Sequence, residues 1–171
     1  MSRIRVPPVF WWSCAGLGAV AALAALGYWW NLGSQARLEV RWLKVRILST
    51  GPESSLAVFD LRMHNPARVL FQVEEVEAAV ADAGGGQTDG LVASQPDLDR
   101  VLSYFPLAGP RYSPVLKFQE RIAPGATADR TVAASFSVPA DVLESRRNFL
   151  LRIQDADGQV TVAEEPRRPA Q

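Results

Sequence analysis

Two patterns of hydrophobic residues divide the sequence. Residues 9–30 (VFWWSCAGLGAVAALAALGYWW) contain no charged residue, whereas from Leu38 onward apolar and polar positions alternate in short runs. If residues 9–30 form a helix, it measures about 33 Å at about 1.5 Å per residue, which is enough to cross a hydrocarbon core of about 30 Å. The predicted order is a basic tail at 1–8, a single transmembrane helix at 9–32, a connector at 33–37, a β-sandwich domain at 38–163 and a disordered tail at 164–171.

Paired tryptophans stand at both ends of the apolar segment: Trp11 and Trp12 at one, Trp29 and Trp30 at the other. Amphipathic rings at both headgroup levels are typical of a spanning helix. We therefore expect these four residues to anchor the helix, with the lipid bilayer as its first partner.

Two other interpretations of this segment stay open. A cleaved signal peptide also begins with basic residues, here Arg3 and Arg5, but its apolar region is shorter and ends at small residues rather than at tryptophans. A lipid attached to Cys14 would need an aliphatic and a small residue where the first tryptophan pair stands. A retained anchor is the favoured reading.

The orientation of the anchor rests on opposing signals. Basic residues lie before the helix and also after it, and the larger number after it would by itself place the domain in the cytoplasm. Those later residues belong to the first predicted strand, however, and long domains translocate largely regardless of charge. We expect the amino terminus in the cytoplasm and the domain on the extracytoplasmic side.

Small residues recur along the apolar segment at three- to four-residue spacing, among them Gly18 and Ala22. Such a stripe lets two helices approach closely, so a homodimer formed through the transmembrane helix is one expectation. The alternative is that alanine simply fills the span.

The remainder of the chain predicts a mainly β domain: an immunoglobulin-like, two-sheet β-sandwich with one or two short helices. Seven or eight short alternating runs are separated by turn residues, which is the pattern of a sandwich. The alternation slips by one residue at Trp42–Leu43 and at Glu74–Glu75, and each slip predicts a β-bulge or a strand that changes sheets.

Several local signals fix where elements begin and end. Ser94, with a proline and an acid after it, predicts a helix at about 96–105, and a second helical turn is expected at 140–147. Asp89–Gly90 is expected to lead into a short return strand at 91–93, and 116–119 is expected to be a strand. Ala123–Ala126 contains the Pro-Gly pair of a type II turn.

Composition excludes several classes of function. Eighteen basic and eighteen acidic residues give no net charge, so the basic footprint of a nucleic-acid-binding protein is missing. The sole cysteine lies in the apolar segment, which leaves the domain without disulfide or thiol chemistry. No pair of histidines or cysteines stands at ligand spacing, so we expect no metal and no cofactor.

The titratable residues predict no catalytic site. His64, the only histidine, follows Asp60 by four residues on one strand face, but no nucleophile motif accompanies this pair. Residues 155–158 (DADG) lack the remaining ligands of a calcium loop, and 84–86 (GGG) lack the lysine of a phosphate loop. We expect a hairpin turn at each, and no enzyme.

The stretches LAVFDLRMHNPARVLFQVEEVEAAVADAGG (56–85) and IAPGATADRTVAASF (122–136) resemble the second group of late-embryogenesis-abundant proteins and the related water-stress (WHy-like) domains. The shared features are a strand ending in Asn-Pro, a second strand with a glycine-rich hairpin, and a Pro-Gly turn before an alternating strand. The predicted helix and the loop YFPLAGPRYSP (104–114) depart from that pattern. The resemblance implies a small, membrane-tethered sandwich that binds or shields rather than catalyses.

One loop has the composition of a protein-interaction surface, because aromatic residues and an arginine on a proline-stiffened loop are typical of interface hot spots. The alternative is a flap whose rings pack over an open end of the sandwich. The residues concerned are Tyr104, Phe105, Leu107, Arg111 and Tyr112.

These observations predict a single-pass, non-enzymatic interaction or envelope-associated module with protein partners. The competing hypothesis is an accessory subunit of a membrane complex, in which the transmembrane helix itself is the binding element. The third hypothesis is that the protein is an enzyme of an unrecognised kind.

Overall fold

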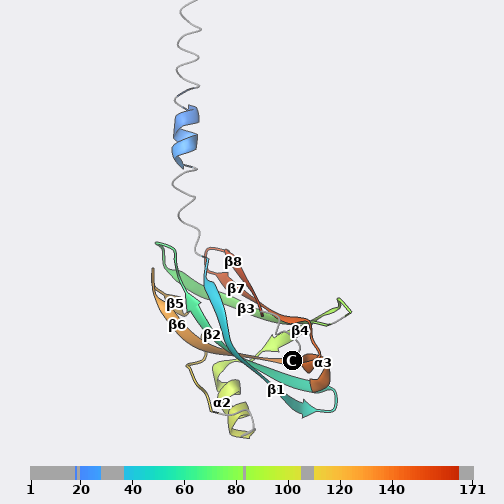
Figure 1. Cartoon of the computed structure of the whole chain (residues 1–171). Helices are drawn as coiled ribbons and strands as arrows, with labels where there is room; N and C mark the ends of the chain where they lie inside the picture. The colour runs from blue at the N-terminus through green and yellow to red at the C-terminus, as the bar shows by residue number, and fades with distance from the viewer. Residues whose placement is uncertain (1–17, 19, 28–36, 83, 105–109, 166–171) are drawn as a thin grey trace, which may run out of the picture. The chain divides into compact units, whose positions relative to one another are not determined.

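The structure is a computed structural model that describes residues 18, 20–27, 37–82, 84–104 and 110–165 (Figure 1). The chain separates into two units, 1–35 and 36–171, and each is described by itself.

In the first unit, residues 18 and 20–27 are helical, and Val20, Leu23 and Leu26 are exposed. Within the described residues, no helix has the length and apolar character needed to cross a membrane. The tryptophans at 11, 12, 29 and 30 lie outside the described residues. Gly18 and Ala22 lie on the helical piece, where nothing tests their predicted helix–helix contact.

The second unit is mainly β, as predicted. Its strands and helices, in chain order, are β1 Glu39–Gly51, β2 Ser54–His64, β3 Phe71–Ala81, β4 Gln87–Val92, α2 Gln95–Tyr104, β5 Arg121–Ile122, β6 Thr127–Phe136, α3 Ala140–Glu144, β7 Asn148–Asp155 and β8 Val160–Glu164.

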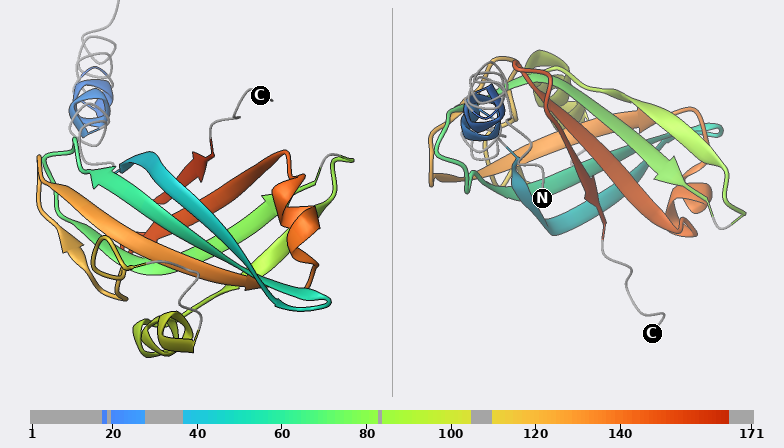
Figure 2. Two further views of the ribbon diagram at one scale, coloured as in Figure 1. Left: turned by 60° about the horizontal axis from the view of Figure 1, so that its bottom comes forward. Right: turned by 90° about the horizontal axis from the view of Figure 1, so that it is seen from above.

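All eight strands belong to one antiparallel sheet of order β1-β2-β6-β4-β3-β7-β8, with β5 paired to β3. The sheet curls so that its two halves face one another across a shared core (Figure 2). Aromatic rings from the two halves pack against each other in the core. The ring centroids of Phe59 on β2 and Phe149 on β7 are 4.9 Å apart, in an edge-on contact. Trp42 of β1 contacts Phe59 in the same way, at 5.3 Å.

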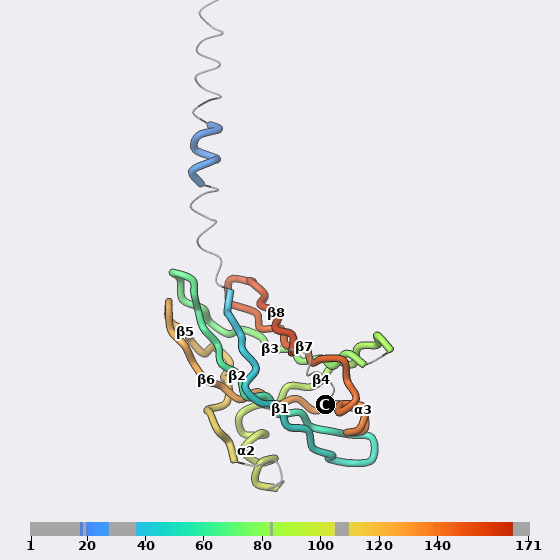
Figure 3. Tube along the Cα trace, in the orientation of Figure 1, coloured from blue at the N-terminus to red at the C-terminus, as the bar shows by residue number. Residues whose placement is uncertain are grey.

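The prediction of two separate sheets is wrong at β4. This strand pairs with β3 over 87–90 and then with β6 over 91–92, so it joins the two halves into one sheet (Figure 3). Asp89 and Gly90, expected to form a turn before a return strand, lie inside β4. Gly90 allows this crossing because it has no side chain. A Cβ built there would stand 2.6 Å from Cε1 of the Phe136 ring.

We expect Gly90→Ala to lower the free energy of unfolding by about 1–3 kcal/mol, because the methyl group must displace a buried ring in a closely packed core. Chemical denaturation of the wild type and the variant measures this difference. Gly84→Ala, in the hairpin tip, is the control, since a Cβ there meets only the flexible Asp82 side chain, at 3.2 Å. Equal stability of Gly90→Ala and wild type would contradict the close approach of β4 to the core.

Both phase slips in the sequence correspond to register shifts in the sheet. The pairing of β1 with β2 shifts between Trp42 and Lys44, and that of β3 with β7 between Val73 and Glu75. The type II turn is also confirmed: Gly125 has φ +69°, and the Ala126 amide donates to the Ala123 carbonyl at 3.0 Å.

Three predicted segments need correction. Residues 116–119 form no strand: only Val115 makes an isolated bridge, to Thr131, and the following residues turn toward β5. The second helix is shorter than 140–147, because it ends at Glu144. The tail does not begin at Glu164, since that residue ends β8 and the Arg146 guanidinium donates to both carboxylate oxygens of Glu165 at 2.8 and 2.6 Å.

Candidate binding groove on the outer face of the sheet

The two halves of the sheet differ in what covers their outer faces. On the β1-β2-β6 half, α2 and Val115 pack over outward-facing apolar residues and form a second, smaller core (Figure 2). Ser94 caps α2 as predicted: the Asp97 amide donates to Ser94 Oγ, and that hydroxyl contacts the Asp97 carboxylate at 2.5 Å. The members of this second core are Leu48, Leu56, Val58, Leu98, Val115 and Ala133.

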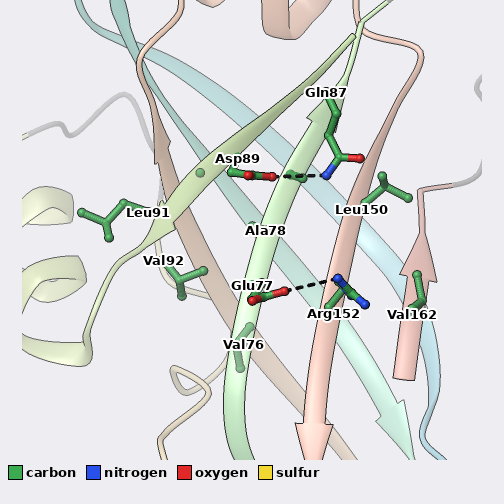
Figure 4. A pocket seen from close by; sticks show the side chains of 12 residues that line it. Val76, Glu77, Ala78, Gln87, Asp89, Leu91, Val92, Leu150, Arg152 and Val162 are labelled. Carbon is green, nitrogen blue, oxygen red and sulfur yellow. Dashed lines mark hydrogen bonds and ion pairs between the residues drawn. The ribbon is translucent and has the colours of Figure 1, made fainter. Parts of the chain in front are cut away.

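The outer face of the β4-β3-β7-β8 half carries an open groove with a volume of about 720 Å³ (Figure 4). Part of its lining is apolar and exposed: Leu91 is 78% exposed and Val162 is 54% exposed. Its lining residues are Val76, Glu77, Ala78, Ala79, Gln87, Asp89, Gly90, Leu91, Val92, Leu150, Arg152 and Val162.

Strand register places the outward side chains of this groove in rows that cross the sheet, because paired residues project from the same face. One row combines Glu77 of β3, Arg152 of β7 and Val162 of β8. The Glu77 and Arg152 side chains form an ion pair at 3.7 Å (Figure 4). The next row runs Asp89, Ala79, Leu150, Glu164, of which Glu164 lies on the β8 edge just beyond the residues that line the groove. That second row therefore has a carboxylate at each end and apolar side chains in the middle.

The groove combines exposed apolar side chains with polar ones. Its polar side chains are exposed and pair with each other. Glu77 forms an ion pair with Arg152, and the side-chain amide of Gln87 donates a hydrogen bond to the Asp89 carboxylate at 3.2 Å. The groove's lining residues include no serine, cysteine, histidine or lysine, and its two carboxylates, Glu77 and Asp89, are the ones held in these pairs. The groove is open on its outer side, whereas pockets for small molecules typically bury most of the ligand's surface.

Sequence reasoning did not find this groove. The signal was present in β8, where Thr161 and Ala163 are buried while Val160 and Val162 point outward. Its aliphatic residues thus lie on the face that alternation normally leaves polar. Recognising this requires knowing which face of β8 meets the core, which depends on pairing with β7.

The predicted interaction loop is only partly described, because Phe105 and Leu107 lie outside the described residues. Tyr104, at the end of α2, is 76% exposed. Arg111 donates to Asp99 of α2 at 2.6 Å, and the Tyr112 ring lies under the Lys44 ammonium at 5.0 Å. The described part of the loop therefore lies along the outer face of the β1 half, and its role as an interaction surface stays a prediction.

Asp60 and His64 do not form a catalytic pair. Asp60 is buried, receives two hydrogen bonds from Arg46 Nη2 at 3.0 and 3.2 Å, and accepts one from Thr131 Oγ1 at 2.8 Å. His64 Nδ1 instead contacts Thr127 Oγ1 at 3.0 Å. Asp60 is therefore a structural carboxylate.

The other candidate sites also have structural roles. Asp155 is buried, and its carboxylate accepts a hydrogen bond from the backbone N–H of Gln72 at 2.6 Å, which joins the start of the β7–β8 hairpin to β3. No group of three or more potential metal ligands occurs within the described part of the chain. Glu74, Glu75 and Glu77 are exposed on β3.

One exposed ion pair shifts the pKa values of both partners. Arg62 donates to both carboxylate oxygens of Asp129 at 2.7 and 2.8 Å. This hydrogen bonding lowers the pKa of Asp129, helped by the positive charge of Arg62, and raises the pKa of Arg62. The pair lies on the outer face across the β2–β6 pairing, away from the groove residues.

Comparison with known proteins gives likeness at the level of structure only. No family model matches the sequence, and no curated protein matches it. An uncharacterised β-sandwich protein of Clostridium difficile 630 is similar with 12% identity and a TM-score of 0.36, over 76% of this chain and 86% of that one. A structural-genomics target protein is similar with 13% identity and a TM-score of 0.37, over 79% and 85%.

The archaellum periplasmic stator protein FlaG of Sulfolobus acidocaldarius is similar with 9% identity and a TM-score of 0.33, over 75% of this chain and 99% of that one. Likeness at this level does not indicate what the chain binds. The description of the fold therefore rests on the strand pairing of this chain itself.

Proposed function

We propose that the chain is a single-pass, membrane-anchored, non-enzymatic interaction module whose domain lies on the extracytoplasmic side. The observation that carries the interaction role is the contrast between the two outer faces of the sheet. One half is covered by the chain's own α2, whereas the other presents an uncovered groove with exposed Leu91 and Val162. An open groove that combines exposed apolar side chains with charged ones is typical of interaction sites.

The proposed anchor is the apolar segment at 9–32, with Trp11, Trp12, Trp29 and Trp30 at its two ends. The support is its length, its lack of charge and its aromatic ends. The proposal also includes an immunoglobulin-like packing of the two halves of this single sheet and a relation to the water-stress domains, supported by the Asn-Pro and Pro-Gly turns at 65–66 and 124–125. Asn65 gives the first of these turns a physical role, since its side chain donates to the Val69 and Ile122 carbonyls at 2.9 Å each.

Photo-cross-linking tests the interaction role in the full chain in its own membrane. A photoreactive residue at Leu91, inside the groove, will give a discrete cross-linked product. The matched control is Phe118, which is 66% exposed but outside the groove. The Leu91 product should also disappear when Leu150→Asp is introduced in the same chain. Equal labelling from both positions, or a product that survives Leu150→Asp, would show that the groove is not the contact surface.

The competing hypothesis of an accessory subunit bound through its helix predicts a different outcome. Replacing 9–30 with an unrelated membrane span keeps the domain anchored but removes the small-residue stripe with Gly18 and Ala22. If the groove is the binding surface, co-purifying proteins will be retained after this replacement. Loss of every co-purifying protein would favour the helix as the binding element.

A further inference from the structure

The groove's charge and spacing point to one class of partner, and this inference rests on the proposed interaction role of the groove. We propose that the groove binds an extended polypeptide segment with a basic residue, an aliphatic residue and a second basic residue at positions i, i+2 and i+4.

The charge of the outer face sets the sign of the partner. Four exposed carboxylates and one guanidinium project from this face of β3, β4, β7 and β8: Glu75, Glu77, Asp89 and Glu164 against Arg152. Arg121 of β5, opposite Gln72 at the start of β3, adds a second guanidinium, so these six residues carry a net charge of −2. Arg152 is already paired with Glu77. Asp89 and Glu164 accept hydrogen bonds only from neutral side-chain amides, those of Gln87 at 3.2 Å and Asn148 at 3.4 Å, so their negative charges can still attract a cationic partner. Complementary charge steers association and suppresses partners of the wrong sign.

The row Asp89, Ala79, Leu150, Glu164 sets the spacing. It crosses from β4 to β8 through three strand-to-strand intervals of about 4.8 Å, so its two carboxyl-bearing residues stand about 14 Å apart. An extended chain rises about 3.4 Å per residue, and residues i and i+4 are therefore also about 14 Å apart.

Side-chain alternation supplies the middle contact. Residues i, i+2 and i+4 of an extended segment project from the same face. With basic residues at i and i+4 over Asp89 and Glu164, the side chain at i+2 lies over Ala79 and Leu150, the apolar middle of the row. An aliphatic side chain at i+2 fits that surface. Helical geometry does not fit as well, since at about 1.5 Å per residue the same span separates residues nine apart, which project in other directions.

The test uses the full chain in detergent micelles and the synthetic peptide acetyl-TKTLTKT-amide, with affinity measured by calorimetry at low salt. We expect binding to this peptide and none to acetyl-TETLTET-amide, which reverses the charges. The peptide acetyl-TKTLKTT-amide keeps the composition but moves the second lysine to the opposite face, and it will bind more weakly. Equal affinity for the two lysine peptides would overturn the spacing, and binding of the glutamate peptide would overturn the charge.

Variants of the chain locate the binding. Asp89→Asn and Glu164→Gln will each weaken binding about three-fold, the range expected for exposed ion pairs, and Leu150→Ser will weaken it about ten-fold or more. The controls Glu53→Gln and Glu144→Gln remove exposed carboxylates outside the groove and will leave affinity unchanged. Equal effects of groove and control variants would place the peptide elsewhere and overturn the proposal.

Two further outcomes separate this proposal from the function on which it rests. Failure of the peptide to bind, together with groove-specific cross-linking at Leu91, would reject the basic partner and leave the interaction module standing. Sedimentation of the full chain as a dimer that Leu150→Ser dissociates would show that a second copy occupies the groove, which would also overturn the basic partner.

Discussion

Removal of residues 1–36 will transfer the protein from the membrane fraction to the aqueous fraction, with the domain still folded. The apolar segment at 9–32 contains no charged residue, whereas the domain from Arg37 to Glu165 has its own core. Burying about twenty apolar residues in lipid outweighs any attraction of the domain for the bilayer surface. The measurements are ultracentrifugation of cell extracts and circular dichroism of the truncated protein, which should show a spectrum dominated by β-strand.

The control for this truncation is the full chain with Leu23→Arg, which places a charge in the middle of the apolar segment. A charged residue at a helix centre costs about 2.5–3.5 kcal/mol on insertion scales, so this variant will insert less completely than wild type. A truncated protein that still sediments with membranes would place the attachment in the domain, and a helical spectrum would reject the fold.

Asp60→Ala will lower the free energy of unfolding by about 3 kcal/mol, the cost of breaking a buried ion pair. The Asp60 carboxylate joins Arg46 of β1 to Thr131 of β6. Arg46 Nη1 also donates to the Pro110 carbonyl at 3.1 Å, and the Thr131 amide donates to the Pro114 carbonyl at 2.8 Å. Loss of the carboxylate removes the Asp60 ion pair from a largely buried guanidinium and loosens the segment that crosses the outer face of β1.

Denaturant unfolding measures the stability of Asp60→Ala, and hydrogen exchange at the Thr131 and Leu116 amides reports whether the 110–116 segment opens. The matched control is Asp129→Ala, which breaks the exposed pair with Arg62 and will leave stability almost unchanged. Because Arg62 lowers the pKa of Asp129, the contribution of that pair is present above the unfolded pKa of about 3.9 and is lost as pH falls through the lower folded pKa. Equal destabilisation by the two variants would contradict the structural role of Asp60.

The strand pattern was predictable wherever one face of a strand is buried and the other is not. The phase slips at Trp42–Leu43 and Glu74–Glu75 located two of the three register shifts, because a one-residue shift exchanges the two faces. The third, between Ser49 and Gly51, lies beside the turn that ends β1 and leaves no such slip in the pattern. β4 was not predictable in this way. Asp89–Gly90 has the composition of a turn, and only the nearby Phe136 ring explains why a glycine occupies the middle of a strand.

The groove was beyond sequence reasoning for a different reason. Its rows combine residues from four strands, and their alignment depends on the pairing register, which local sequence does not specify. The partners of Asp60 and His64, a pair for which the sequence indicated no catalytic role, were beyond sequence reasoning for a related reason. Asp60 and His64 share a strand, yet the buried Asp60 is held by Arg46 and Thr131 from the neighbouring strands. Local spacing identified both residues but could not identify their partners.

The most direct test of a membrane-anchored, extracytoplasmic domain is protease protection of the full chain in sealed vesicles of known orientation, with an epitope tag after Gln171. In vesicles that expose the extracytoplasmic side, protease should remove the tag, and carbonate at high pH should leave the protein in the membrane pellet. A tag that protease removes only from inverted vesicles, or a protein that carbonate releases, would contradict the account.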